Sequence, residues 1–270
     1  MLKTDTGFTG HVPQLYETYL VPLLFEPYAK DIVNRLQLSK PLSILETAAG
    51  TGVVTRELDA QLPAYVRIVA TDLNQPMIDQ AALQKSNHVI EWKAADAQQL
   101  PFADESFDAV VCQFGVMFFP DKPKAYAEAY RVLKPGGVFI FNVWDSLHDN
   151  DFGDAVNTAM ETLFASDPPR FLARTPYAYN DNNIITNDLT AGGFINTPFI
   201  ETVTCYTTAK SPNTPAIAFC YGSPLRNDIE SKHPMMLEKA VEAAEAEIIM
   251  RFGTGMVKGK LQAKIVQVLK

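Results

Sequence analysis

Two kinds of apolar pattern alternate along the first half of the chain. Apolar runs of strand length lie at Ser43–Glu46, Val66–Thr71, Val89–Lys93, Phe107–Gln113 and Val138–Trp144. Patterns with helical spacing lie between them at Thr51–Gln61, Pro76–Gln84 and Lys122–Leu133. Strands that alternate with helices at this spacing predict right-handed crossovers, so we expect an α/β fold with a mainly parallel, doubly wound sheet.

The segment before the first strand has the pattern of a helix. Apolar residues recur at every fourth position from Leu20 to Leu36, which is the spacing of one helical face. Pro22 and Pro27 lie inside this stretch, and an internal proline removes a backbone donor and crowds the preceding turn. We therefore predict an N-terminal helical cap over about residues 1–40 that is broken or kinked into pieces.

The pattern is looser after Trp144. Helices are predicted at Phe152–Phe164, Asn183–Ala191, Ala216–Tyr221 and Glu238–Met250, and strands at Phe199–Thr207 and Leu261–Leu269. The segment Lys134-Pro135-Gly136-Gly137 is predicted to end the preceding helix with a left-handed glycine cap. Because no clean linker or repeat divides the chain, we expect a single domain over residues 1–270, with a lid or insert at about 145–195.

A glycine turn after the first strand is the strongest candidate for a binding site. It runs from Glu46 through Ala48 and Gly50 to Gly52, and Asp72 stands near the end of the following strand. Glycine permits positive φ and a close approach of a ligand to the backbone, and the helix that opens at the turn offers unpaired N–H groups. An acid at the end of the second strand can accept both hydroxyls of a ribose. The turn therefore predicts a nucleoside site and leaves the nucleoside open.

Composition disfavours several classes of partner. The formal net charge is −8 and the pI is about 5.0, which disfavours nucleic acid. No apolar run has the roughly 20 residues of a membrane span, and the first residues show no apolar signal-peptide core. Three widely spaced cysteines favour reduced thiols, so we expect a cytoplasmic protein.

Several ordered motifs resemble those of class I S-adenosylmethionine-dependent methyltransferases. The turn has the form of that family's first motif, acid-x-G-x-G-x-G, with Ala48 in place of the first glycine. Lys93–Phe102 resembles the third segment, Phe107–Gly115 the fourth motif, and Arg131–Gly137 the signature before the fifth strand. The chain is similar to the small-molecule branch that includes ubiquinone and menaquinone biosynthesis C-methyltransferases. The resemblance implies a seven-stranded Rossmann-like sheet whose last strand lies antiparallel between its neighbours, a helical lid, and S-adenosyl-L-methionine as cofactor.

The resemblance also implies roles for residues in and after the turn. Asp72 is expected to bind the ribose hydroxyls, with a solvated strand-end acid as the alternative. Glu46 is expected to orient the methionine amino group, or else only to fix the turn. The other cofactor-binding residues implied are Tyr16, Tyr19, Ala48, Gly50, Gly52, Leu73, Met77, Asp96, Ala97, Gln113 and Phe114.

The outer residues of this set have competing structural interpretations. Asp96 and Ala97 are expected at the adenine edge, although Asp96 could instead cap a helix. Leu73 and Met77 are expected to line the adenine pocket, although Met77 could equally belong to the core.

Two further pairs are expected nearer the methyl group. Gln113 and Phe114 are expected beside the sulfonium, with core packing as the alternative for Phe114. Tyr16 and Tyr19 are expected to close over the cofactor from the cap, with packing of a surface helix as their alternative.

The candidate for a general base is His148, because it follows the fifth strand near the edge where ligands bind in such sheets. An exposed loop histidine is the alternative. The nearby acids Asp145, Asp149 and Asp151 suit a solvated loop better than a magnesium site, so we expect no metal.

Two other functions stay open at this point. An NAD-dependent oxidoreductase also uses a glycine turn and an acid after the second strand, but Val53-Val54-Thr55 follows Gly52 without the further glycine that a pyrophosphate favours. A non-catalytic S-adenosylmethionine-binding protein would need the same pocket. We expect a small-molecule methyl acceptor; the acceptor, the methylated atom and the oligomeric state, a homodimer included, are left open.

Overall fold

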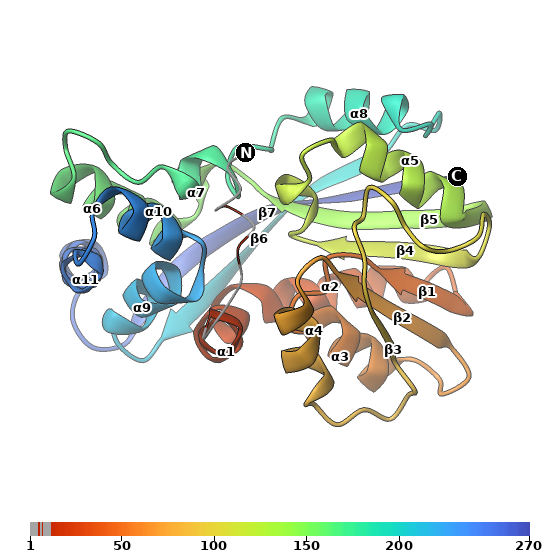
Figure 1. The fold of residues 1–270 in the computed structure, drawn as a ribbon, viewed down its shortest axis with the longest axis horizontal. Coiled ribbons are helices and arrows are strands. Elements are labelled where there is room, and N and C mark those ends of the chain that lie inside the picture. The colour runs from red at the N-terminus through yellow and green to blue at the C-terminus, as the bar shows by residue number, and fades with distance from the viewer. Residues whose placement is uncertain (1–4, 6, 8–11) are drawn as a thin grey trace. The chain divides into compact units, whose positions relative to one another are not determined.

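The computed structural model describes residues 5, 7 and 12–270 of the chain (Figure 1). Its strands are β1 Ser43–Glu46, β2 Arg67–Asp72, β3 Glu91–Ala94, β4 Phe107–Gln113, β5 Leu133–Trp144, β6 Phe199–Ala209 and β7 Val257–Leu269. They form a seven-stranded sheet in the order β3-β2-β1-β4-β5-β7-β6. The pairs β1–β2, β1–β4, β2–β3 and β4–β5 are all parallel, which confirms the mainly parallel sheet.

The helices before the sixth strand are α1 Val12–Leu15, the π-helix η2 Tyr16–Phe25, α2 Glu26–Gln37, α3 Val53–Gln61, α4 Gln75–Ala82, the short η3 Val116–Phe118, α5 Lys122–Val132, the short η4 Leu147–Asp149, α6 Asp151–Leu163, α7 Phe171–Arg174 and α8 Asn182–Ala191. Those after it are α9 Asn213–Gly222, α10 Leu225–Lys232 and α11 Leu237–Phe252. Within the described residues, no helix has both the length and the apolar content needed to cross a membrane.

The last strand runs antiparallel between its neighbours, as the resemblance implied. β7 stands between β5 and β6 in the sheet order. The N–H of Asp145 donates to the carbonyl of Gln262 at 3.0 Å, and the N–H of Lys270 donates to the carbonyl of Gly137 at 2.9 Å. Residue numbers on the last strand therefore fall as those beside it rise, which is the antiparallel pattern.

The predicted glycine cap at Lys134–Gly137 is wrong. Helix α5 ends before this segment, and β5 already begins at Leu133. Leu133 pairs with Phe107, and the register then shifts before Ala109, as it does at a β-bulge. Gly136 has a φ of 76°, and its N–H donates to the last residue of the chain at 3.2 Å. Backbone hydrogen bonds between both glycines and Lys270 thus draw this segment into the sheet.

The chain forms two compact units. Unit 1 consists of the chain up to Phe25, Trp144–Ala178 and Val203–Ala263; unit 2 consists of Glu26–Val143, Tyr179–Thr202 and Lys264–Lys270. The single-domain organisation with a cap and an insert stays a prediction. The described part of the cap divides between the units, because η2 lies in unit 1 and α2 in unit 2.

The N-terminal helix is in pieces, as its prolines predicted. Pro22 lies inside the π-helix η2, where it has no N–H to donate to the helical ladder. Pro27 lies in the first turn of α2, where a missing N–H costs nothing because that donor is unpaired anyway. Residues 1–4, 6 and 8–11 of the predicted cap lie outside the described residues.

Arg131 on α5 accounts for part of the signature before β5. Its guanidinium donates to the carbonyls of Leu100 at 3.0 Å and Phe102 at 2.7 Å. It also pairs with Glu128 at 2.8 Å and with Asp104 at 2.7 Å. The arginine therefore fixes the loop that leads from β3 to β4 against α5.

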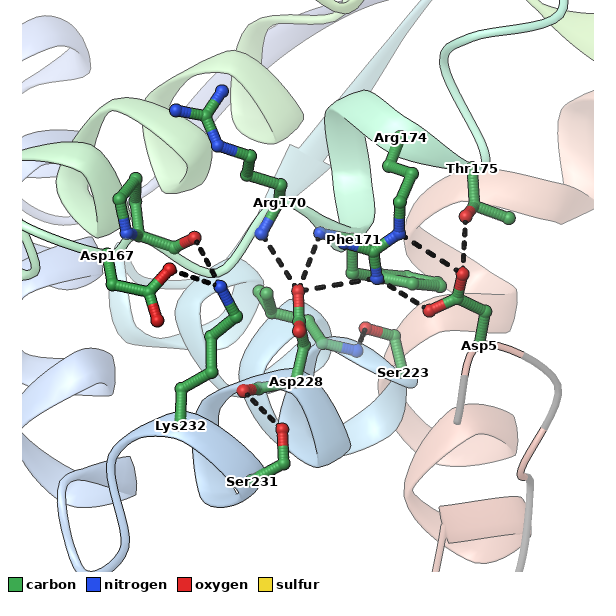
Figure 2. Close-up of polar contacts among 12 residues, drawn as sticks. Asp5, Asp167, Arg170, Phe171, Arg174, Thr175, Ser223, Asp228, Ser231 and Lys232 are labelled. Atoms are coloured by element: carbon green, nitrogen blue, oxygen red, sulfur yellow. Dashed lines mark hydrogen bonds and ion pairs between the residues drawn. The ribbon is translucent and has the colours of Figure 1, made fainter. Parts of the chain in front are cut away.

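A buried acid organises a polar cluster in unit 1 (Figure 2). Oδ2 of Asp228 on α10 accepts the N–H groups of Arg170 at 2.8 Å and Phe171 at 2.9 Å, and it lies 3.5 Å from Nη2 of Arg174. Arg174 also pairs with the buried Asp5 at 2.7 Å. Because a helix as short as α7 is not stable alone, these contacts are what hold it in place.

His88 ties the loop before β3 to α3 in unit 2. Its Nδ1 lies 2.8 Å from Oδ1 of Asp59, and its Nε2 lies 2.9 Å from the carbonyl of Pro63, so both ring nitrogens face acceptors. Burial alone would lower the pKa of His88, but its bonds to Pro63 and Asp59 outweigh burial and raise that pKa. For Asp59, hydrogen bonds from Asn87 and His88 outweigh burial and lower its pKa to about 2.

We predict that raising the pH weakens this link. Because the folded protein binds the proton of His88 more tightly than the unfolded chain, the stabilisation is full below the ordinary pKa of about 6.5 and is lost as the pH rises through the raised value. His88→Gln should lower the free energy of unfolding by about 1–3 kcal/mol near pH 5.5 and by less near pH 9, measured by urea denaturation. An equal loss at both pH values would contradict a charged His88.

Candidate functional site

The glycine turn joins β1 to α3 in unit 2. Ala48, Gly50 and Gly52 all lie in the left-handed region, with φ values of 52°, 57° and 82°. Glycine adopts this conformation freely, whereas Ala48 does so at a cost of about 1–2 kcal/mol. Because two of these three residues are glycines, few side chains cover the turn, and its backbone can approach a ligand at the carboxyl ends of β1 and β2.

The carboxylate of Asp72 joins this turn to the next crossover. Its Oδ2 accepts the N–H of Gly50 at 2.9 Å, and its Oδ1 accepts the N–H of Asn74 at 2.8 Å. Asp72 is 7% exposed, and burial raises its pKa although these N–H groups act in the opposite direction. Oδ1 also accepts the side-chain amide of Asn74 at 3.3 Å. Oδ2 keeps a lone pair, and a ligand hydroxyl can replace the long Asn74 side-chain bond at Oδ1, so the carboxylate can accept two hydroxyl donors.

Glu46 is the second acid of the site. It is 1% exposed, and Oγ1 of Thr55 donates to its Oε2 at 2.5 Å. Burial raises its pKa to about 8; the Thr55 bond and the charge of Arg56 lower that pKa, and the charge of Asp72 raises it further. Two buried carboxyls in one site are therefore unfavourable as a charged pair, and a cation between them would relieve the repulsion.

The residues of the turn fit a polar nucleoside ligand. Oγ1 of Thr51 is buried and has no hydrogen-bond partner within residues 5, 7 and 12–270. A buried hydroxyl without a partner is costly, so a polar atom of a ligand or a water is expected there. The free hydroxyl and the lone pairs of Asp72 give the turn the donors and acceptors that a ribose and an amino acid tail need.

Gly52 has a packing role that the sequence did not reveal. A Cβ at this position would lie 2.9 Å from the ring of Trp92 and 3.3 Å from the Cβ of Ala81. Trp92 on β3 and Ala81 on α4 therefore occupy the room beside the third glycine. This corresponds to the close helix–strand packing that the third glycine of dinucleotide turns allows. Its contact with cofactor stays a prediction.

Ala48 packs against the turn that follows β4. A Cβ on Gly115 would lie 2.5 Å from the Cβ of Ala48 and 2.7 Å from Sγ of Cys112. The alanine that replaces the family's first glycine thus turns its methyl toward Gly115. Only a glycine at position 115 leaves room for that methyl.

The expected adenine residues follow β2 and β3 in unit 2. Leu73 is 59% exposed, which leaves its side chain free to cover a flat ring, whereas Met77 is buried in α4. The carboxylate of Asp96 accepts the N–H of Gln98 at 2.8 Å, so the acid forms a local turn. Ala97 is half-buried. Their adenine contacts stay predictions.

Gln113 and Phe114 lie at the end of β4, where the sequence placed them. Gln113 is half-buried and pairs in register with Asn142 of β5. Phe114 is buried and lies in the left-handed region with a φ of 49°, and its ring meets Tyr28 edge-on at 5.3 Å. No sequence pattern indicated this strained backbone.

The remaining candidates belong to unit 1. Tyr16 stacks on Phe25 at 5.2 Å, and Tyr19 is half-buried on the same π-helix. The side chain of His148 is 92% exposed and lies 3.9 Å from Asp154. An imidazole so open to water has an ordinary surface environment, and its role as a base stays a prediction.

The acids near His148 have partners of their own in unit 1. Asp149 pairs with Lys260 at 3.1 Å, Oδ2 of Asp151 accepts the N–H of Lys260 at 2.6 Å, and Oδ2 of Asp145 accepts from Gln262 at 2.9 Å. Over the described ranges, no three His, Cys, Asp or Glu side chains gather as a metal site would require.

Comparison with known sequences identifies the family. A family model described as "Methyltransferase domain" matches residues 45–141. A ubiquinone/menaquinone biosynthesis C-methyltransferase from Marinomonas is 30% identical over 170 residues, which are 58% of this chain and 67% of that protein. A demethylmenaquinone methyltransferase from Deinococcus radiodurans is 42% identical over 100 residues, 36% of this chain and 41% of that protein. The chain spans about half the length of several curated relatives it matches.

Solved structures share the fold at low identity. The YcgJ protein of Bacillus subtilis has a TM-score of 0.54 and 18% identity, over 88% of this chain and 97% of that one. A phosphoethanolamine N-methyltransferase 2 of Haemonchus contortus, solved with S-adenosyl-L-methionine, has a TM-score of 0.59 and 16% identity, over 99% of this chain and 60% of that one. The [4+2]-cyclase SpnF has a TM-score of 0.50 and 16% identity, over 88% of this chain and 80% of that one. Because a cyclase shares it, the fold alone does not define the chemistry.

The chain belongs to the class I S-adenosylmethionine-dependent methyltransferases. S-adenosylmethionine is the cofactor of this class, and the turn of unit 2 has the groups to hold it. The curated relatives named above are methyltransferases, and they give the NAD-dependent alternative no support.

We predict that Gly115→Ala destabilises the protein by about 1–3 kcal/mol, because the new methyl overpacks the space beside Ala48. The φ of Gly115 is −99°, so the loss would come from the clash and not from the backbone. Ala48→Gly in the same chain should restore part of the loss, with the rest due to Cys112. Chemical denaturation of the two single variants and the double variant measures this coupling.

Gly136→Ala is the matched control. Gly136 has a φ of 76° and nothing within 4 Å of its missing Cβ, so the substitution tests backbone strain alone. The change that Gly136→Ala causes in the free energy of unfolding should simply add to the change caused by Ala48→Gly. A double variant of Gly115 and Ala48 that is no more stable than Gly115→Ala would refute the packing account.

Proposed function

We propose that the protein transfers a methyl group from S-adenosylmethionine to a small-molecule acceptor in the cytoplasm. The observation that carries the proposal is the pair of buried acids, Glu46 and Asp72, on either side of a left-handed glycine turn. Among the described residues, Cys112, Cys205 and Cys220 form no disulfide, which agrees with a reducing compartment.

The charge of the site favours a cationic ligand. Burial raises the pKa of both Glu46 and Asp72, so a positive charge near them would stabilise their ionised forms. S-adenosylmethionine carries a sulfonium and an ammonium group, and these positive charges would stabilise the two buried carboxylates. The pyrophosphate of NAD is negative and would add to the repulsion.

The residues of unit 2 would divide the work of binding. Asp72 accepts the ribose hydroxyls, Glu46 faces the amino group, and Leu73 with Ala97 covers the adenine. Gln113 and Phe114 stand on the side of the reacting methyl. Bound S-adenosylmethionine supplies an activated methyl group on sulfur. The chain's part is to align an acceptor with that methyl and to exclude water, a task in which Tyr16 and Tyr19 of the cap would share.

The acceptor is the least defined part of the proposal. The relatives from Marinomonas and Deinococcus radiodurans are named for quinone biosynthesis, so phenols and quinols are the first acceptors to test. His148 is the candidate base for an acceptor that must lose a proton. Amines come second, because the neighbour from Haemonchus contortus is named as an N-methyltransferase.

We predict that S-adenosylmethionine and S-adenosylhomocysteine bind and that NAD does not. Asp72→Ala should weaken S-adenosylhomocysteine binding by about 100-fold, since two hydrogen bonds to a charged acceptor are worth about 3 kcal/mol. Isothermal titration calorimetry measures both expectations.

Asp79→Ala is the matched control for this titration. Asp79 is an exposed acid on α4 whose partner is Gln75 at 2.7 Å, so its loss should leave the affinity unchanged. Near-normal affinity in folded Asp72→Ala would overturn the assigned pocket. Binding without transfer to any phenol, quinol or amine would favour a non-catalytic binding protein.

A further inference from the structure

The buried part of β5 carries one polar side chain among apolar ones. Phe139, Ile140, Phe141 and Val143 are buried, and Asn142 between them is 0% exposed. Burying an amide is costly unless it is hydrogen-bonded, and an apolar residue of the same size would fill the space as well. Packing alone therefore gives no reason for an asparagine here.

Asn142 holds the strained residue at the end of β4. Its Oδ1 accepts the N–H of Phe114 at 2.8 Å, and its backbone carbonyl accepts the same N–H at 3.2 Å. Phe114 has a φ of 49°, a conformation that aromatic residues rarely adopt and that persists only where the surroundings enforce it. The amide of Asn142 is a contact that enforces it.

The turn held in this way reaches the candidate site. It carries Gln113 and Phe114, and the next residue, Gly115, packs against Ala48 of the glycine turn. A relaxation of Phe114 to negative φ would shift Gln113 and Gly115 together. The turn after β4 thus packs against one end of the glycine turn, away from the ribose and amino contacts of Asp72 and Glu46.

The nitrogen of the same side-chain amide provides a second, independent observation. Nδ2 of Asn142 is buried and has no hydrogen-bond partner in the described part of the chain. Gln113 is its register partner on β4, and paired residues of parallel strands point to the same face. A buried donor on the register partner of Gln113, on the same face of the sheet, is suited to fix the side-chain amide of Gln113.

We propose that Asn142 is the positioning residue of the methyl-transfer site, and that its amide sets both the left-handed turn at Phe114 and the side chain of Gln113 on the reacting side. Oδ1 holds the left-handed turn through its bond to Phe114. Nδ2 orients the side chain of Gln113 by donating to its Oε1 when a ligand orders that side chain. Asn142 itself is buried and touches no reacting atom. The inference rests on the proposed function for its chemistry.

The ligand-free test is amide exchange at the turn. Asn142→Leu keeps the size of the side chain and removes its hydrogen bond to Phe114 together with the Nδ2 donor, so the N–H of Phe114 should exchange at least about 10-fold faster. Val143→Ala is the matched control, because it removes buried volume from the same strand without touching that N–H. Equal exchange at Phe114 in the wild-type and Asn142→Leu proteins would overturn the proposal.

The kinetic test separates positioning from stability. In Asn142→Leu, kcat for methyl transfer should fall by about 10- to 100-fold, since a misplacement of about 1 Å has effects of that size. The dissociation constant for S-adenosylhomocysteine should change by less than about threefold, because the ribose and amino contacts stay in place. Val143→Ala should keep its kcat at a temperature where it is folded.

A double-mutant cycle tests the route through Gln113. If Asn142 acts through that side chain, Gln113→Ala should lower kcat by a much smaller factor in the Asn142→Leu variant than in the wild-type protein. Additive effects, or a kcat that falls only with the folded fraction, would overturn the proposal. Wild-type protein that neither binds S-adenosylhomocysteine nor transfers a methyl group would instead overturn the proposed function, and the exchange result would then still decide whether Asn142 holds the turn.

Discussion

The bond between the carboxylate of Asp72 and the N–H of Gly50 is the constraint on which the site depends. It joins the end of β2 to the glycine turn after β1, and the other oxygen of the same carboxylate holds the start of α4 through Asn74. Two crossovers of unit 2 are thereby fixed to one buried charge. The fold can hold that charge away from water because the backbone N–H groups of Gly50 and Asn74 donate to it, yet burial still raises its pKa.

Glu46 makes this constraint a functional one. A single buried acid with good hydrogen bonds can be purely structural, but two buried acids whose charges repel each other are poorly arranged for stability alone. Local features that cost stability are expected where binding compensates them. The same reasoning applies to the left-handed Ala48, the left-handed Phe114 and the buried amide of Asn142, all of which lie at the carboxyl ends of the central strands.

The sequence predicted the fold well, because buried parallel strands and amphipathic helices leave clear periodic patterns. It also placed Asp72 and Glu46 at strand ends. It was wrong about Gly136 and Gly137, which pair in the sheet, because a glycine pair after a helix has the same pattern as a cap. It did not reveal that Trp92 fills the space beside Gly52, that Gly115 makes room for Ala48, or that Asn142 holds Phe114, since each of these contacts joins residues far apart in the sequence.

The central claim is that Glu46 stays protonated until a cation enters the site. Titrating S-adenosylhomocysteine into the protein near pH 7, by calorimetry in buffers of different ionisation enthalpy, tests it most directly. With the pKa of Glu46 at about 8 before binding, the ammonium of the ligand should lower that pKa and release close to one proton, and Glu46→Gln should abolish the release. Binding of the ligand to the wild-type protein with no proton released, or with protons taken up, would contradict the account.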